Sequence, residues 1–139
     1  MFSSRKGSGL SERYEALDRS QAIIEFDLDG TIRHANANFL EALGYTADEV
    51  VGKHHRMFVA PVDAASTEYT RFWEHLRGGN WHSGEFRRIH KSGRTVWINA
   101  TYNPIMSGGK PVGIIKFASD ITEQKTADAD RMGQLEAIG

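Results

Sequence analysis

Three runs of alternating apolar and polar residues fill the second half of the chain and predict three consecutive strands. They span residues 81–90, 94–104 and 111–119, and the links between them are short and rich in glycine. Links this short require antiparallel neighbours, because a parallel pair needs a long crossover. Every second residue of the middle run is apolar and should face the core: Val96, Ile98, Ala100 and Tyr102. A meander with one apolar face needs a cover from elsewhere in the chain.

The first part of the chain predicts a hairpin that completes the sheet. Residues 21–28 alternate in polarity, and Asp29-Gly30 is a strong signal for a tight turn before a second strand at 31–35. The last strands must pair with this hairpin across the intervening residues. The sequence therefore predicts a five-stranded antiparallel sheet.

Between the hairpin and the meander, the apolar residues follow a helical period. Residues 36–43 predict a helix that ends at Gly44, and Thr46 opens a short helical turn. A single turn is expected within 53–58, and Ser66 caps a longer helix. Helices inserted into an antiparallel sheet give an α+β class, with the helices packed on one face.

Apolar stripes continue into both ends of the chain. Residues 1–9 predict a flexible start, and a short helix follows through Leu10, Tyr14 and Leu17. At the other end Asp120 can cap a final helix whose apolar positions are Met132, Leu135 and Ile138. The organisation expected is a flexible start and N-terminal helix at 1–19, a core domain at 20–122, and the beginning of an exit helix at 123–139.

Composition narrows the function further. The chain has 139 residues, a net charge of −1 and no cysteine. The charge gives no reason to expect nucleic acid, and the lack of cysteine excludes disulfides, thiolate metal sites and cysteinyl adducts to a chromophore. No apolar run is long enough for a membrane helix, and the N-terminus has no secretory signal. A cytoplasmic protein without membrane insertion is the expectation.

Residues 20–123 resemble the PAS sensor domains. The resemblance is carried by IIEFDLDGTIRHANANFLEALGYTADEVVGK, by GEFRRIHKSGRTVWINATYNPI and by GKPVGIIKFASDIT. A narrower likeness, in GKHHRMFV and EYTRFWEHLRGGNWHSGEF, is to the N-terminal cytoplasmic PAS domains of bacterial methyl-accepting chemotaxis receptors of the aerotaxis and redox type. It implies a PAS fold, a sensory input role, and a downstream signalling domain in the same chain.

The adjacent histidines His54 and His55 are the candidate metal ligands. Some PAS domains similar to this one ligate haem from this segment, and a neutral imidazole is a good axial ligand for iron. If Lys53–Phe58 forms a helical turn, His54 shares a face with Met57 and Phe58, so His54 is the preferred ligand and His55 the reserve. A solvated histidine beside a capping histidine is the alternative.

A flavin such as FAD is the alternative cofactor, and a domain without any cofactor is a further possibility. Trp73, Trp81 and Asn99 are the candidate contacts, because the run from Trp81 resembles the flavin site of redox sensors. Burial in the core explains the tryptophans equally well. Four cations crowd one hairpin, and exposed strand positions explain them: Arg87, Arg88, Lys91 and Arg94.

These residues support three possible functions to different degrees. A sensory module leads: a small ligand or cofactor between sheet and helices biases the terminal helices. A ligand-free interaction domain follows, because the chain has enough aromatic residues to fill its own core. An enzyme is not expected, since no nucleophile, base and acid form a constellation. The apolar stripes of the flanking helices also predict a symmetric homodimer.

Overall fold

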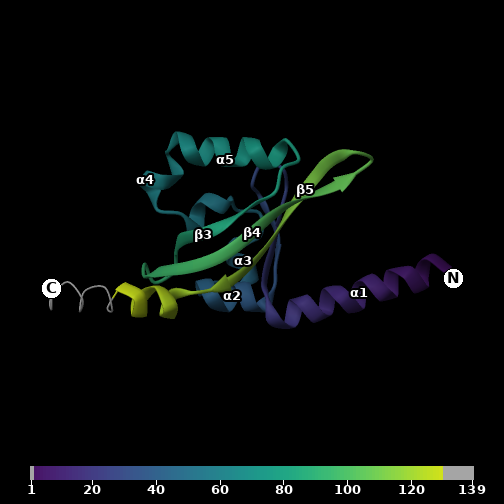
Figure 1. Cartoon of the computed structure of the whole chain (residues 1–139), viewed down its shortest axis with the longest axis horizontal. Coiled ribbons are helices and arrows are strands. Elements are labelled where there is room, and N and C mark those ends of the chain that lie inside the picture. The colour runs from purple at the N-terminus through teal and green to yellow at the C-terminus, as the bar shows by residue number, and fades with distance from the viewer. Residues whose placement is uncertain (1, 130–139) are drawn as a thin grey trace.

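The computed structural model describes residues 2–129, with side chains from Leu10 onward. A single five-stranded antiparallel sheet forms its centre, as predicted (Figure 1). The strands are β1 (Ala22–Phe26), β2 (Ile32–Ala35), β3 (His82–Ile89), β4 (Thr95–Ser107) and β5 (Lys110–Asp120). The helical segments are α1 (Phe2–Ser20), α2 (Ala37–Leu43), α3 (Ala47–Val50), η1 (His55–Phe58), α4 (Pro61–Ala64) and α5 (Thr67–Arg77), followed by helical residues 122–129.

The strand order is β2-β1-β5-β4-β3, so the two halves of the chain meet in the middle of the sheet. β3, β4 and β5 form the predicted meander of neighbours. β1 and β5 pair along their length, from Ala22 opposite Ala118 to Phe26 opposite Ile114. Consequently the start of β1 and the end of β5 lie side by side, where α1 enters the sheet and residues 122–129 leave it.

The inner face of the sheet is the one that the helices cover. The predicted inward residues of β4 are buried: Val96, Ile98, Ala100 and Tyr102. They form one core cluster with apolar side chains of the helical segments, including Phe39, Leu43, Val50, Phe58, Trp73 and Leu76. The alternation therefore predicted the inner face of β4 correctly, because a strand turns successive side chains to opposite faces.

Caps fix the ends of the helices. The Asn36 side chain accepts a hydrogen bond from the Phe39 N–H at 2.9 Å and begins α2, and Gly44, with φ of 79°, ends it in the left-handed region. Thr46 and Glu49 form the predicted capping box of α3, and the Ser66 hydroxyl caps α5. These caps fix where α2, α3 and α5 begin.

The flanking helices extend in opposite directions from the same end of the sheet (Figure 1). The N-terminal helix begins at Phe2, so the flexible start expected for residues 1–9 is wrong from residue 2 onward. Leu10 and Leu17 are 64% and 44% exposed on α1. Residues 122–129 are helical, as predicted, whereas Met132, Leu135 and Ile138 lie outside the described residues. No helix in the described part of the chain is long and apolar enough to cross a membrane.

Candidate functional site

His54 lies at the rim of the domain and connects two loops. Its Nδ1 accepts a hydrogen bond from the Arg56 N–H at 3.0 Å, and its Nε2 donates to the Asp29 carbonyl oxygen at 2.8 Å. Gly30, beside that carbonyl, has φ of 92°, and a Cβ there would lie 2.6 Å from His54 Nε2. The close approach of the imidazole therefore requires the glycine of the hairpin turn.

His55 instead lies at the centre of the core. It is completely buried; its Nδ1 is 2.7 Å from the Tyr69 hydroxyl and its Nε2 is 3.0 Å from the Tyr102 hydroxyl. Burial holds the pKa of His55 well below its ordinary value, and the nearby positive charges of Arg88 and Lys116 add to the effect. His55 is therefore a neutral imidazole at physiological pH.

The predicted orientation of the two histidines is wrong. We expected His54 to face inward with Phe58, but η1 is a 3-10 helix that begins at His55, with His54 as its N-cap. Residues three apart share a face in a 3-10 helix, so His55 and Phe58 point inward together. The tighter period of this turn, which begins at His55 rather than at Lys53, exchanges the environments of the two imidazoles.

A haem does not fit the histidines in this arrangement. Both ring nitrogens of His54 and of His55 have hydrogen-bond partners, so neither side chain presents a free nitrogen to iron. Within residues that the structure describes, no group of three or more histidine, cysteine or acidic side chains is placed to hold a metal ion. Iron ligation by His55 would cost the hydrogen bond to one of the two tyrosines, Tyr69 at Nδ1 or Tyr102 at Nε2.

The other three candidate residues are not brought together. Trp73 is buried, and its ring meets the His55 ring edge-on with centroids 5.3 Å apart. Trp81 is 66% exposed just before β3, and Asn99 is exposed on the face of β4 that turns away from the helices. Only Trp73 of the three therefore belongs to the space between helices and sheet.

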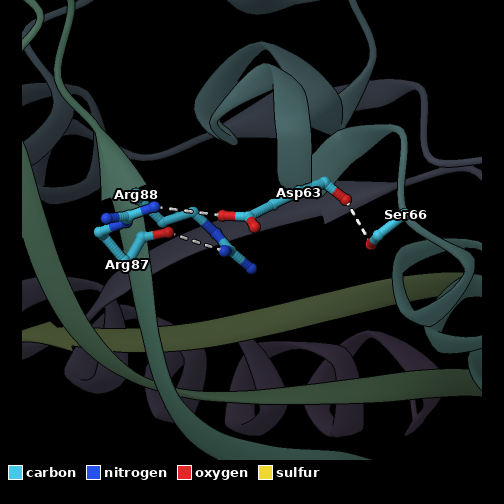
Figure 2. A network of polar contacts seen from close by, with 4 residues as sticks. All are labelled: Asp63, Ser66, Arg87 and Arg88. Carbon is cyan, nitrogen blue, oxygen red and sulfur yellow. Dashed lines mark hydrogen bonds and ion pairs between the residues drawn. The ribbon is translucent and has the colours of Figure 1, made fainter.

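A groove between α5 and the edge strand β3 is the main concave feature near this space. Its volume is about 770 Å³, within the range of small-molecule sites. Aromatic rings from both elements line it: Tyr69, Phe72, His75, His82 and Phe86. Asp63 and Ser66 border one end, where Ser66 Oγ donates to the Asp63 carbonyl oxygen and Arg87 reaches the Asp63 carboxylate at 3.5 Å (Figure 2).

Two buried cations lie on the inner face beside this groove. Arg88 is only 7% exposed and lines the groove. Its Nη2 donates to the Tyr102 hydroxyl at 2.9 Å, and its Nη1 donates to the Arg87 carbonyl at 3.0 Å. Lys116 is fully buried, with Nζ 4.8 Å from the Tyr102 ring centroid. Among the described residues, neither Arg88 Nε nor Lys116 Nζ has a hydrogen-bond partner. Two positive charges thus flank one phenol.

Burial and the neighbouring charges shift the pKa values of Lys116, Tyr102 and Tyr69. Burial lowers the pKa of Lys116 to about 8. Burial alone would raise the pKa of Tyr102, but Arg88 and Lys116 outweigh it and lower the pKa of this phenol. Tyr69, on the other side of His55, has a pKa raised by burial to about 12. The inner face is therefore electropositive around Tyr102.

Our interpretation of the sequence missed both cations. We explained Arg88 by an exposed strand position, and it is buried instead. Strand parity was the available signal, because Arg88 shares a face with Phe86, and Lys116 shares one with Ile114. Charged residues at inward positions of a strand are the pattern that would have revealed this cluster.

The outer face of the sheet holds the exit helix. The backbone of Trp97 in β4 accepts a hydrogen bond from the Ile121 N–H at 2.8 Å and donates one to Thr122 Oγ1 at 2.9 Å. The carboxylate of Asp120 accepts from the Thr122 N–H at 2.9 Å. Lys125 pairs with Glu85 of β3 at 2.6 Å and lies over the Trp97 ring. This exit latch, formed by Trp97, Asp120, Thr122 and Lys125, joins the helix to β3 and β4.

Comparison with known proteins places this geometry in a family. A family model described as the PAS fold matches residues 32–118, more than half of the chain. The chain is 46% identical over 124 residues to the biofilm dispersion protein BdlA of Pseudomonas aeruginosa, covering 88% of this chain and 30% of that protein. It is 31% identical over 101 residues to the aerotaxis receptor of Escherichia coli, covering 73% of this chain and 20% of the receptor. It thus spans less than a third of the length of these relatives.

Solved structures agree on the fold. The PAS domain of a Colwellia psychrerythraea protein superimposes with a TM-score of 0.71 at 28% identity, covering 82% of this chain and 98% of that one. A light-oxygen-voltage domain studied with a flavin analogue gives 0.68 at 23% identity, over 88% of this chain and 93% of the other, which is a likeness of fold alone. The chain belongs to the PAS-fold family, as a sensory domain related to the aerotaxis receptor and the biofilm dispersion protein.

Proposed function

We propose that this domain is the sensory input module of a chemotaxis-type signal transducer. It binds a small molecule between α5 and the sheet and relays the occupied state through its terminal helices. The observation that carries the proposal is that β3 and β4 serve both ends of this path. Residues of β3 and Trp97 of β4 line the groove, and Glu85 of β3 and Trp97 also hold the exit helix.

The relay follows from the shared strands. A ligand that moves β3 relative to β4 displaces Glu85 relative to the Trp97 backbone, and these two groups hold opposite sides of the exit helix. A ligand shifts such an equilibrium only by the difference between its affinities for the two states. Glu85 and Trp97 both line the groove and contact the exit helix, so movement of these two strands is the coupling.

A chimera tests this function directly. This chain replaces the matched segment of the Pseudomonas aeruginosa biofilm dispersion protein, and biofilm dispersion is measured in a strain that lacks the native protein. We expect the chimera to restore dispersion and Thr122→Val, which removes the hydroxyl of the latch, to impair it. Restored dispersion that is insensitive to Thr122→Val would contradict a relay through the latch, and a stable chimera without activity would contradict the sensory role.

The ligand class is open to a simple measurement. A flavin in the groove would contact the rings of Phe72 and Phe86 rather than Trp81 and Asn99, which lie elsewhere. The absorption spectrum of the freshly purified protein distinguishes a flavin from a haem, and native mass spectrometry detects a colourless ligand. We expect no Soret band, because both histidines are engaged.

A homodimer is part of the proposal. Leu10 and Leu17 lie seven residues apart on α1 and are exposed, so both project from similar positions of the helix. Docking two copies of α1 would bury them. Leu10→Ser/Leu17→Ser should yield a monomer in sedimentation, whereas Val62→Ser, which alters an equally exposed apolar residue elsewhere, should leave the dimer intact. A double variant that still dimerises as tightly as the wild type would exclude this interface.

A second candidate function is a ligand-free interaction domain. One observation favours it: the space between helices and sheet is filled by His55 and the rings around it, including Phe26, Phe58, Tyr69, Trp73 and Tyr102. In that case the domain would dimerise and connect to its downstream partner without a ligand. Native mass spectrometry that shows only the bare mass, together with a functional chimera, would favour this alternative.

A further inference from the structure

We propose that the groove between α5 and β3 binds the carboxylate of a small aromatic acid, with Arg88 as its direct partner. This inference rests on the proposed function and names the class of ligand. Three features carry it: an excess of buried positive charge, a guanidinium that lines the groove and has a buried, unpaired donor, and a lining of aromatic rings.

The buried charge lacks a counter-ion. The ion pairs of the described residues join Arg33 to Asp27, Arg87 to Asp63, Lys91 to Glu49 and Lys125 to Glu85, and none includes Arg88 or Lys116. A guanidinium stays protonated in proteins, so Arg88 is a buried cation at any physiological pH. A buried charge without a partner costs free energy that a bound anion would offset.

Arg88 is placed to be that partner. It lines the groove, and its hydrogen bonds to the Arg87 carbonyl and the Tyr102 hydroxyl leave the buried Nε without an acceptor among the described residues. Its guanidinium stands over the Phe86 ring at 4.9 Å from the centroid, which fixes its plane. A planar guanidinium with unused N–H groups matches the two oxygens of a carboxylate. Lys116, on the other side of Tyr102, strengthens the positive field from within the core.

The lining selects the rest of the ligand. Phe72 and Phe86 lie with ring centroids 6.0 Å apart, Tyr69 and Phe72 stack at 6.5 Å, and His82 approaches both phenylalanines. Aromatic rings prefer offset or edge-on neighbours at these distances, so an aromatic ring is well accommodated among them. Three acids line the groove, Asp63, Glu68 and Glu85, and none of them forms an ion pair with Arg88; Asp63 is paired with Arg87 and Glu85 with Lys125. A carboxylate at Arg88 with its ring toward Phe72 satisfies both parts of the groove.

Benzoate is the probe for this site. Titration calorimetry on the whole chain should show binding of benzoate, and much weaker binding of benzamide, which keeps the ring without the charge. Cyclohexanecarboxylate tests the aromatic ring, and acetate and inorganic phosphate test a plain anion site. Arg88→Gln should weaken benzoate at least tenfold, whereas Arg94→Gln, a matched change of an exposed arginine at the turn of the same hairpin, should not change it.

A second readout does not depend on the variants being stable. The Arg88 Nε–H resonance of the wild-type protein, assigned by its loss in Arg88→Lys, should shift on addition of benzoate while the Arg94 Nε–H resonance stays. Lys116→Met should weaken benzoate by a smaller factor than Arg88→Gln. Absence of benzoate binding, equal binding of benzamide, or an Arg88 signal that does not move would each overturn the proposal.

An internal counter-ion is the competing explanation. If Tyr102 were a phenolate in the free protein, it would neutralise Arg88 without a ligand. The ultraviolet absorbance of phenolate at neutral pH should therefore be absent in the wild type; its presence there, with loss in Tyr102→Phe, would overturn the proposal. Loss of the benzoate site would leave the sensory role intact as long as the chimera restores dispersion, so the two failures are distinguishable.

Discussion

The two faces of the sheet treat charge in opposite ways. On the outer face, Lys125 is paired with Glu85, and Asp120, Thr122 and the Trp97 backbone satisfy one another. On the inner face, Arg88 and Lys116 surround Tyr102 without a carboxylate among the described residues. The paired polar groups of the outer face hold the exit helix in place. The buried cations of the inner face have no counter-ion, and a bound anion would offset the free-energy cost of burying them. On this contrast rests our proposal that the inner cations recognise the ligand, while Glu85 and Trp97 connect the groove to the exit helix.

The largest expected effect lies at the centre of the inner face. His55→Ala removes a buried ring and leaves the hydroxyls of Tyr69 and Tyr102 without their imidazole partner, so we expect the free energy of unfolding to fall by about 3 kcal/mol. His54→Ala, its neighbour, removes the cap of η1 and the hydrogen bond to the Asp29 carbonyl at the rim, and should cost about 1 to 2 kcal/mol. Urea denaturation of both variants measures the difference; similar losses would contradict the assignment of His55 to the core.

The low pKa of His55 adds a dependence on pH to the same pair. The unfolded chain protonates this imidazole near pH 6.5, whereas the folded protein does so only at lower pH, so the unfolded state binds more protons in between. Stability should therefore fall as pH decreases below 6.5. Burial also lowers the pKa of His54, but less than that of His55, so the slope should be reduced strongly in His55→Ala and only slightly in His54→Ala.

A smaller effect of opposite sign is expected at Lys116. Its pKa falls from 10.5 to about 8 on folding, which corresponds to an upper bound of about 3 kcal/mol of destabilisation near neutral pH. Lys116→Met keeps the length and removes the charge, so it should stabilise the protein by about 2 kcal/mol. Thermal or urea unfolding at pH 7 checks this gain.

The sign of the pH dependence provides a control for Lys116. Between pH 8 and 10.5 the unfolded state holds the proton that the folded state has lost, so the penalty disappears as pH rises through this window. The rise should be visible already from pH 7 to 9 in the wild type and absent in Lys116→Met. A variant no more stable than the wild type would mean that the inner charge is already compensated.

The next effect concerns the outer face. Asp120→Ala removes the acceptor of the Thr122 N–H and should cost about 1 kcal/mol, in the range of lost helix caps. Asp120→Asn keeps a side-chain oxygen and should cost less. Hydrogen exchange should show faster exchange at 122–129 without change at α5; equal acceleration in α5 would indicate general destabilisation rather than loss of the latch.

The smallest effect is expected at the Glu85–Lys125 pair. Both side chains are partly exposed, and such pairs contribute about 0.5 kcal/mol or less. Lys125→Gln should cost no more than this, and high salt should remove the difference. A loss that persists in high salt would show that the contact of Lys125 with the Trp97 ring, rather than the ion pair, fastens the helix.

The sheet was predictable because its pattern is local. Alternation fixed the inner residues of β4, Asp29-Gly30 fixed the first turn, and the Thr46/Glu49 box fixed the start of α3. The short links also predicted that β3, β4 and β5 are neighbours, whereas the prediction that the meander joins the first hairpin did not specify which strands meet. Each of these inferences depended on residues close together in the sequence.

The site was harder to predict because it depends on contacts between distant residues. A 3-10 turn that begins at His55 decides which of the two histidines faces inward. The tyrosines that hold His55 there lie 14 and 47 residues away from it in the sequence. Tryptophan is usually buried, but Trp81 is exposed just before β3. Arg88 and Lys116 followed the strand period, but charge at an inward position runs against the usual rule for buried residues.

The pairing of β1 with β5 also governs how this domain folds. Ala22 lies opposite Ala118, so the centre of the sheet joins nearly the first and the last residues of the core. Contacts of such sequence separation slow folding, because a long loop must close before they form. During synthesis on a ribosome, β1 emerges long before β5 and cannot pair with it until β5 has been made. The β3–β4–β5 meander, in contrast, pairs strands that are neighbours in the sequence. The end of α1 is held by Asn36 and Asn38, which are close to it in sequence, whereas the exit helix leaves from this last seam and acquires its position only when folding of the whole domain is complete.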